Sequence, residues 1–387
     1  MKFSSQDLMN TLGETVKFPN LLANVKNPNS IDDIDRDFSR GLLSGDASLH
    51  IQNLSLKYGY PLKKYKVVTE DGYKLTLYRI QRKGPVVFLM HGLICSADDY
   101  MTPGPKSSLA YLLADAGYDV WLGNARGNKH SRHNIRLLPS DPKFWDFSWH
   151  EIGIYDLPAM IDYVLKETRQ KKLKYIGHSQ GTTSFYVMAS ERPEYNKKIS
   201  IMISLSPVAY MSHITSPFLK VLAGPGNALY SLLKYIGLYE FLPSNAVVQS
   251  LKTLLCGAVL KAEILCSNVV FLIAGFDWEQ LNITNLPVIY GHMPAGAATK
   301  QIMHYAQGIT SGDFKQFDYG PAENNQRYGS AQPPNPIDVE QLRGELGNVV
   351  DYHKVDYFPF NHFDFIWAKD LKRILYRHIM ELLKLYN

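Results

Sequence analysis

Strand-like and helix-like runs alternate between residues 86 and 205, and this alternation limits the possible folds more than any other feature of the chain. The run Val86–Met90 has no polar residue, which is typical of a strand buried on both faces of a parallel sheet. Such alternation predicts a mostly parallel sheet with helices on both faces. The strand-like runs are Val86–Met90, Asp119–Gly123, Lys174–Gly177 and Ile199–Leu205, and the helix-like runs are 109–116, 154–165 and 180–190.

A β-hairpin is predicted ahead of this alternating region. Tyr65–Thr69 and Tyr73–Tyr78 are rich in β-forming residues, and they flank the turn sequence Glu70-Asp71-Gly72. An Asp-Gly pair between two such runs is a strong hairpin signal. Residues 1–57 are polar and weakly patterned, so we expect a loosely ordered N-terminal segment and an ordered core that begins near Tyr58.

The alternation stops after Pro207, and residues 207–320 are mostly helical in pattern, rich in glycine and unusually apolar. We expect a helical cap inserted into the core, which would then comprise residues 58–206 and 321–387. The most apolar part, Val247–Phe276, is either a hinged lid over an oily site or a passive wall of packed helices. A strand is predicted at Val349–Val355 and a final helix at Leu371–Leu382.

Composition excludes several classes of protein. Hydrophobic residues make up 45% of the 387 residues and charged residues 20%, so a sizeable core can form and global disorder is excluded. A net charge of +5 is too mild to indicate a nucleic-acid partner. We expect no transmembrane segment, because Lys252, Lys261 and Glu263 interrupt the most apolar region. The first thirty residues contain no apolar h-region, so we expect no signal peptide in the chain as written.

The sequence Gly177-His178-Ser179-Gln180-Gly181 joins a predicted strand to a predicted helix. In a G-x-S-x-G turn the serine lies on a strained corner, where larger residues in place of the glycines would clash. Its hydroxyl lies close to the N-terminus of the helix, where backbone N–H groups stabilise developing negative charge. The motif therefore predicts a nucleophile for acyl transfer at Ser179.

Other histidines have structural interpretations. His130 and His133 are spaced like metal ligands, but no cysteine or carboxylate cluster accompanies them. His150 and His178 are expected to satisfy local hydrogen bonds. We therefore expect neither a metal ion nor a cofactor.

Weak signals point to a secretory compartment. Cys256 and Cys266 are close enough in sequence to close a small loop, whereas Cys95 lies in a different segment. Asn53-Leu54-Ser55 and Asn282-Ile283-Thr284 match the N-glycosylation pattern, which makes Asn53 and Asn282 the candidate acceptors.

Taken together, the motifs of this chain resemble those of the acid lipase family, the α/β-hydrolases that include gastric and lysosomal acid lipases and insect relatives. The resemblance implies hydrolysis of lipid carboxylic esters, acylglycerols or sterol esters, at an oil–water or membrane interface in a secreted or lysosomal setting. It extends from about Tyr58 to the C-terminus and rests on Thr69–Tyr73, His91-Gly92-Leu93, Gly123–Gly127, Phe147–Gly153, the Ser179 turn, Ala274–Asp277 and Asn361–Phe365.

The resemblance also implies roles for individual residues. Ser179 would be the nucleophile and His362 the general base, in the chain order that this fold uses. The backbone N–H groups of Leu93 and Gln180 would bind the oxyanion. Cys256 and Cys266 match the disulfide of the family's cap.

The chain departs from the family where the triad acid is expected. The family carries this aspartate at the end of a strand that should precede the last one, and here the flanking sequences join directly at Pro334-Asn335. A deletion of about one strand and its loop explains the gap. Asp338 is the nearest carboxylate, but it matches a helix position beyond the acid.

Three functions follow from this pattern. The first is a lipase-type serine esterase, in which loss of the acid alone would reduce turnover by about ten-thousand-fold. The second is a catalytically inactive, lipase-like lipid-binding protein. The third is an esterase for small soluble esters.

Overall fold

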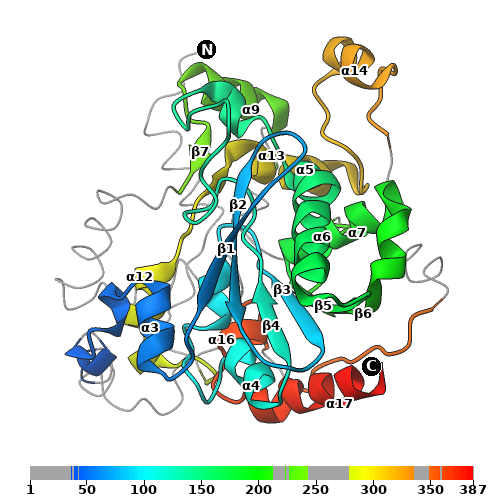
Figure 1. The fold of residues 1–387 in the computed structure, drawn as a ribbon. Coiled ribbons are helices and arrows are strands. Elements are labelled where there is room, and N and C mark those ends of the chain that lie inside the picture. Colours follow the sequence, from blue (N-terminus) through cyan, green and yellow to red (C-terminus); the bar gives the residue numbers. More distant parts are fainter. Residues whose placement is uncertain are drawn as a thin grey trace.

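The computed structural model describes residues 36, 39–41, 43–211, 223, 226–242, 279–334, 348–357 and 360–386. Its centre is a six-stranded sheet in the order β1-β2-β4-β3-β5-β6 (Figure 1). The pairs β4/β3, β3/β5 and β5/β6 are parallel, while β1/β2 and β2/β4 are antiparallel. The predicted mostly parallel sheet is therefore confirmed. The strands are β1 Lys63–Val68, β2 Lys74–Ile80, β3 Val86–Met90, β4 Asp119–Leu122, β5 Leu173–His178 and β6 Ile199–Leu205.

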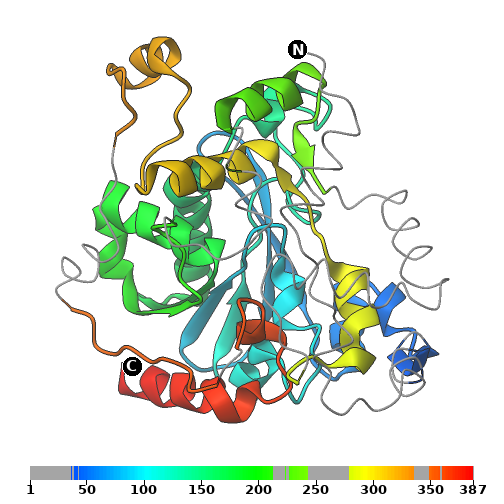
Figure 2. The same ribbon diagram turned by 180° about the vertical axis from the view of Figure 1, so that it is seen from behind.

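Helices cover both faces of this sheet (Figures 1 and 2). Val87 and Leu89 of β3 pack into one core with α4 (Leu109–Asp115) and α17 (Arg377–Leu385). The alternate residues of β3 pack into a second core with α6 (Leu157–Thr168) and α7 (Gln180–Glu191). All five residues of β3 are buried, because side chains that alternate along the strand enter two separate cores.

The hairpin forms as predicted. Val68 of β1 pairs with Lys74 of β2, and Gly72 in the turn has a φ of 95°, which glycine adopts readily. Arg126 fastens this turn to the helical layer, because its guanidinium donates to Asp71 Oδ1 (2.8 Å) and to Asp156 Oδ1 (2.8 Å). The two motifs that contain Asp71 and Arg126 thus meet in one ion-pair network around the buried guanidinium of Arg126.

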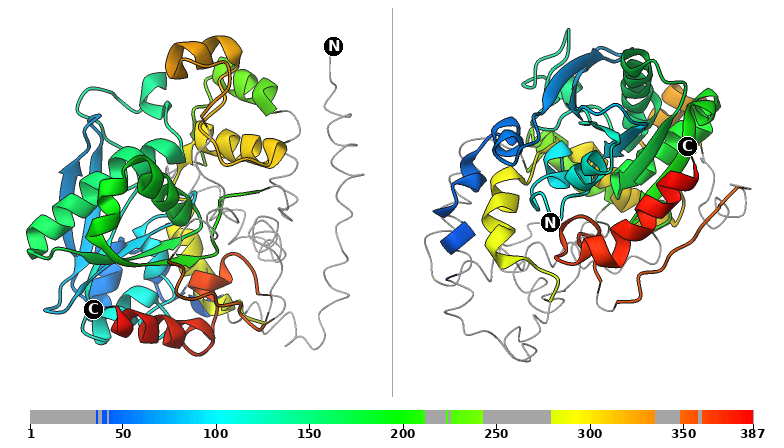
Figure 3. Two further views of the ribbon diagram at one scale, coloured as in Figure 1. Left: turned by 90° about the vertical axis from the view of Figure 1, so that its right-hand side faces the viewer. Right: turned by 60° about the horizontal axis from the view of Figure 1, so that its bottom comes forward.

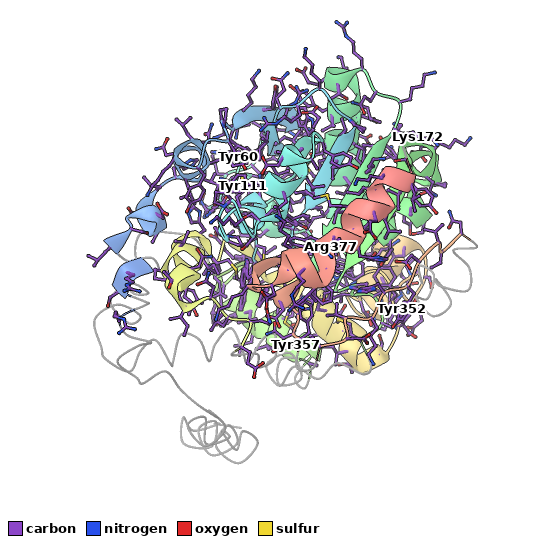
Figure 4. The ribbon with its side chains drawn as sticks, turned by 90° about the horizontal axis from the view of Figure 1, so that it is seen from below. Tyr60, Tyr111, Lys172, Tyr352, Tyr357 and Arg377 are labelled. Carbon is purple, nitrogen blue, oxygen red and sulfur yellow. The ribbon has the colours of Figure 1, made fainter. Side chains whose placement is uncertain are left out.

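The ordered core begins before Tyr58. Residues 51–57, which the sequence assigns to the loosely ordered N-terminal segment, form α3 (Ile51–Lys57), and Ile51 and Leu54 are buried in the core of α4. Tyr60 follows α3 and stacks on Tyr111 of α4, with ring centroids 4.4 Å apart (Figure 4). The chain is therefore attached to the sheet ahead of β1.

The insertion after β6 is largely helical in its described part. α9, β7 and α13 lie at the opposite end of the molecule from α17 (Figures 1 and 3), whereas Val288 and Ile289 of α12 pack into the core of α4. Val247–Phe276 lies outside the described residues, so the question of lid or wall stays open there. The elements are α9 Gly226–Tyr235, β7 Glu240–Phe241, η6 Ile283–Asn285, α12 Leu286–His292, β8 Ala297–Ala298, α13 Thr299–Ser311 and α14 Pro321–Tyr328.

No helix in the described ranges is long and apolar enough to cross a membrane. Short helical turns complete the fold. These turns are η1 Asp46–Ser48, η2 Ala97–Tyr100, η3 Pro142–Trp145, α5 Trp149–Glu151, η4 Ile152–Asp156, η5 Pro193–Lys198, α16 Asp364–Trp367 and η7 Lys372–Tyr376.

The predicted strand at Val349–Val355 is wrong. Residues 348–357 form no strand, and this segment follows α17 along the outside of the molecule (Figures 2 and 4). His378 of α17 holds it through a 2.6 Å hydrogen bond with Asp351 and through ring stacking on His353. A strand needs a neighbour to satisfy its backbone, and within the described residues the sheet ends at β6, with which residues 348–357 do not pair.

The close packing of α7 against β3 can be tested by glycine-to-alanine substitutions, which add a methyl group. A Cβ at Gly181 would lie 2.3 Å from the carbonyl oxygen of Met90, whereas at Gly308 of α13 the nearest atom would be 3.5 Å away. Gly181→Ala should lower the free energy of unfolding by about 1–3 kcal/mol because backbone must move, and Gly308→Ala should be neutral or stabilising. Urea unfolding measures both changes, and equal stabilities for the two variants would contradict the predicted contact.

Candidate active site

Ser179 lies on a sharp corner between β5 and α7. Its backbone has φ 52° and ψ −118°, a conformation that non-glycine residues rarely adopt. A Cβ on Gly177 would lie 2.8 Å from the carbonyl of Gly181, so a larger residue at Gly177 would clash with α7. The backbone N–H of Ser179 donates to Leu205 O of the neighbouring β6 at 3.0 Å. The predicted strand–turn–helix setting of the motif is confirmed.

His362 lies beside this serine although 183 residues separate them in the chain. Its Nε2 is 2.7 Å from Ser179 Oγ, within hydrogen-bond distance. Asn361 Oδ1 accepts from the backbone N–H groups of Phe363 and Asp364 and so shapes the turn that presents the imidazole. The structure thus brings together the two residues that the sequence pairs as nucleophile and base.

His178, the residue before Ser179, supports the turn that contains His362. Its Nε2 donates to the backbone carbonyl of His362 at 3.0 Å, so the residue before the nucleophile holds the loop of the base. The sequence predicts a local partner for His178, and the partner is instead distant in the chain. Burial, followed by the neighbouring His362, lowers the pKa of His178 to about 3, which keeps this ring neutral.

The imidazole of His362 is also neutral over most of the pH range. The residue keeps some exposure, but protein surrounds its ring, and burial lowers its pKa to about 4. A neutral imidazole within hydrogen-bond distance of a hydroxyl can accept the hydroxyl proton. The arrangement therefore has the geometry and the protonation state for general-base chemistry.

The two predicted oxyanion residues flank the serine. Gln180 is the first residue of α7, where backbone N–H groups have no acceptor within the helix, and its side chain donates to Gln301 of α13 at 2.7 Å. Leu93 follows Gly92, at which an added Cβ would lie 3.1 Å from Ser179 Cβ. His91 anchors this loop, because its Nε2 accepts from Ala125 N at 3.1 Å.

The other ring nitrogen of His362 faces a second serine. Ser206 Oγ lies within hydrogen-bond distance of His362 Nδ1, at the place where a triad would have its carboxylate. Sequence reasoning missed Ser206, although its position directly after the run Ile199–Leu205, at the carboxyl end of a predicted strand, was a usable signal. The weak candidate Asp338 lies outside the described residues.

The remaining predicted residues lie away from Ser179 or are not described. His130 contacts the buried Asp98 (Nε2–Oδ1 2.8 Å), and among the described residues no cluster of metal-binding side chains occurs. Cys256 and Cys266 lie outside the described residues, so their disulfide stays a prediction, while Cys95 is a buried free thiol. Glycosylation also stays a prediction at Asn53, which is exposed, and at Asn282, which is partly exposed.

Comparison of the sequence with known proteins identifies the family of this chain. Residues 51–104 match the model of a partial alpha/beta-hydrolase lipase region, and residues 85–234 match that of the alpha/beta hydrolase fold. Lipase 1 of Drosophila melanogaster is 43% identical, over 87% of this chain and 80% of its own. Mouse gastric triacylglycerol lipase is 40% identical over 87% of this chain and 92% of its own. The chain belongs to the acid lipase family.

A solved structure supports the fold of this acid lipase family member. A putative lipase from Sulfolobus solfataricus superimposes with a TM-score of 0.57 over 84% of this chain and 94% of its own, at 14% sequence identity. At that identity the likeness concerns the fold alone. The predicted α/β-hydrolase fold is thereby confirmed.

The low pKa of His362 predicts an unusual pH profile. Burial disfavours the imidazolium, so the base stays neutral from high pH down to about pH 4 and is lost by protonation below that value. The rate at which a phosphonate ester labels Ser179 should therefore be constant between pH 5 and 7 and fall about tenfold per unit below about pH 4. Circular dichroism at each pH controls for unfolding. An acid limb near 6.5, the ordinary value for histidine, would contradict the predicted burial.

Proposed function

We propose that this protein is a lipase that hydrolyses carboxylic esters of lipids, acylglycerols or sterol esters, through an acyl-enzyme on Ser179. The observation that carries the proposal is the 2.7 Å contact between Ser179 Oγ and the neutral imidazole of His362. Serine is a weak nucleophile until a base takes its proton, and this contact supplies the base.

The chemistry proceeds in two halves. Ser179 Oγ attacks the ester carbonyl while His362 Nε2 takes the hydroxyl proton, and the oxyanion accepts hydrogen bonds from the backbone N–H groups of Gln180 and Leu93. His362 then returns its proton to the leaving alcohol, which leaves the acyl group on Ser179. Water, activated by the same imidazole, attacks the acyl-enzyme and releases the fatty acid.

Lipid esters are the substrate class that the relatives support. Two of them are named gastric triacylglycerol lipases, from mouse and human, and each matches this chain over at least 87% of its length. The protein would act on substrate at an oil–water or membrane surface. Secretion or delivery to the lysosome stays a prediction.

A second function is favoured by one observation. Within the described residues, His362 Nδ1 meets the hydroxyl of Ser206 and not a carboxylate. A site whose base lacks a charged partner turns over slowly, so the protein could bind lipid esters without hydrolysing them at a useful rate. Lipid binding without ester turnover would support this alternative.

Replacement of the nucleophile tests the proposal. Ser179→Ala should lower kcat on emulsified triolein and on a soluble short-chain ester by at least about a thousand-fold, because the covalent route is lost. Ser190→Ala is the matched control, since Ser190 lies at the far end of α7 and its hydroxyl donates to Val187 O of the same helix at 3.1 Å. Ser190→Ala should keep the wild-type rate.

Three outcomes separate the alternatives. Turnover that survives in Ser179→Ala would exclude the acyl-enzyme route. Wild-type protein that binds triolein emulsion but hydrolyses neither ester, and whose Ser179 resists a phosphonate, would assign the lipid-binding function. Equal rates on emulsified and dissolved ester would identify an esterase for small soluble substrates.

A further inference from the structure

We propose that Ser206 is the third member of the site, a positioning residue whose hydroxyl accepts the Nδ1 proton of His362 in place of a carboxylate. This inference rests on the proposed esterase function and names the device that orients its base. Because Ser179 donates to Nε2 in the resting site, the neutral ring carries its proton on Nδ1, and Ser206 Oγ is the acceptor that this proton meets.

The position of Ser206 follows from the sheet register. β5 and β6 are parallel, with Gly177 opposite Ser204 and His178 opposite Leu205, so the next pair along these strands is Ser179 and Ser206. Ser206 therefore occupies the same level at the carboxyl edge of the sheet as the nucleophile, one strand further along. Parallel strands place their carboxyl ends at one edge, which is where ligands bind in open α/β sheets.

Three hydrogen bonds close a ring through this corner. Ser179 N donates to Leu205 O, Ser206 Oγ meets His362 Nδ1, and His362 Nε2 meets Ser179 Oγ. The peptide bond between Leu205 and Ser206 completes this ring of contacts. Rotation of the imidazole away from Ser179 would break the contact at Ser206 as well. The hydrogen bonds therefore oppose the motion that would take His362 out of reach of Ser179.

The backbone at Ser206 points to the same role. Its φ is 49°, in the left-handed region that non-glycine residues rarely adopt, and residues strained in this way cluster at active sites. Ser179 is also left-handed, with φ 52°, and the two strained residues face the same histidine. Aspartate is several-fold enriched at such positions, so Ser206→Asp can be accommodated by the backbone.

A hydroxyl and a carboxylate at this place have different consequences. Both accept the Nδ1 proton and orient the ring, but only the carboxylate stabilises the imidazolium by charge. The titratable group that faces His362 from the adjacent strand β5 is His178, whose ring lies 5.2 Å away and is neutral. From the turn of His362 itself, Asp364 contributes a carboxylate that accepts from Asn361 N at 2.5 Å. Burial is the effect that lowers the pKa of His362.

Two substitutions at one position test the proposal in the full-length protein. Ser206→Ala keeps the backbone and removes the acceptor, so kcat on a soluble ester should fall about three- to tenfold with KM unchanged, the effect of losing one neutral hydrogen bond. Ser206→Asp adds the charge, so kcat should rise at least about tenfold and the acid limb of the pH profile should move upward by about one unit or more. Ser200→Ala, the same change at the start of β6, is the control and should match wild type.

With circular dichroism at each pH as the control for unfolding, the shift of the acid limb distinguishes positioning from a structural role, since a merely destabilised variant would lose its folded signal together with its activity. Ser206→Ala with wild-type kcat, or Ser206→Asp with an unmoved limb and no gain, would overturn the role of Ser206. A loss of about ten-thousand-fold in Asp338→Asn, with Ser206→Ala unaffected, would overturn it too and assign the acid to Asp338. If Ser179→Ala retained turnover, the esterase function itself would fail, which none of the Ser206 results alone can cause.

Discussion

The tight corner at Ser179 is the constraint on which the rest of the site depends. The ends of three parallel strands, β3, β5 and β6, converge there, and α7 begins one residue later. Backbone approaches backbone so closely that Gly177 and Gly181 have no room for a Cβ. The left-handed backbone of Ser179 is held by its hydrogen bond to β6 and by the helix that starts at Gln180. The same packing exposes the serine hydroxyl to His362.

Among the described residues, burial and a hydroxyl at Nδ1 give this site its chemical character. A carboxylate beside Nδ1 would favour the imidazolium and raise the pKa of the base. Here Ser206 supplies only a neutral acceptor, and burial lowers the pKa of His362 to about 4. A base of low proton affinity drives proton transfer less strongly but remains available in acid.

The described C-terminal region adds no strand to the sheet. β6 becomes the last strand of the described sheet, and residues 348–357 follow α17 through contacts of Asp351 and His353 with His378. His362 nevertheless reaches Ser179, because its turn is tied to His178 at the end of β5 and to Ser206 at the end of β6. His362 is therefore located by β5, the strand that leads into Ser179, and by its neighbour β6.

The sequence by itself determined the elements whose signals are local. The unbroken apolar run of β3, the Asp-Gly hairpin turn, the glycines around Ser179 and the helix that begins at Gln180 are each specified by neighbouring residues, and each was predictable. Only the tertiary structure decided what meets His362. Ser206 has no motif of its own, and its role depends on the register of β6 against β5. The prediction of a strand at Val349–Val355 was wrong because strand formation also depends on a partner distant in the sequence. A strand forms only where a neighbouring strand satisfies its backbone.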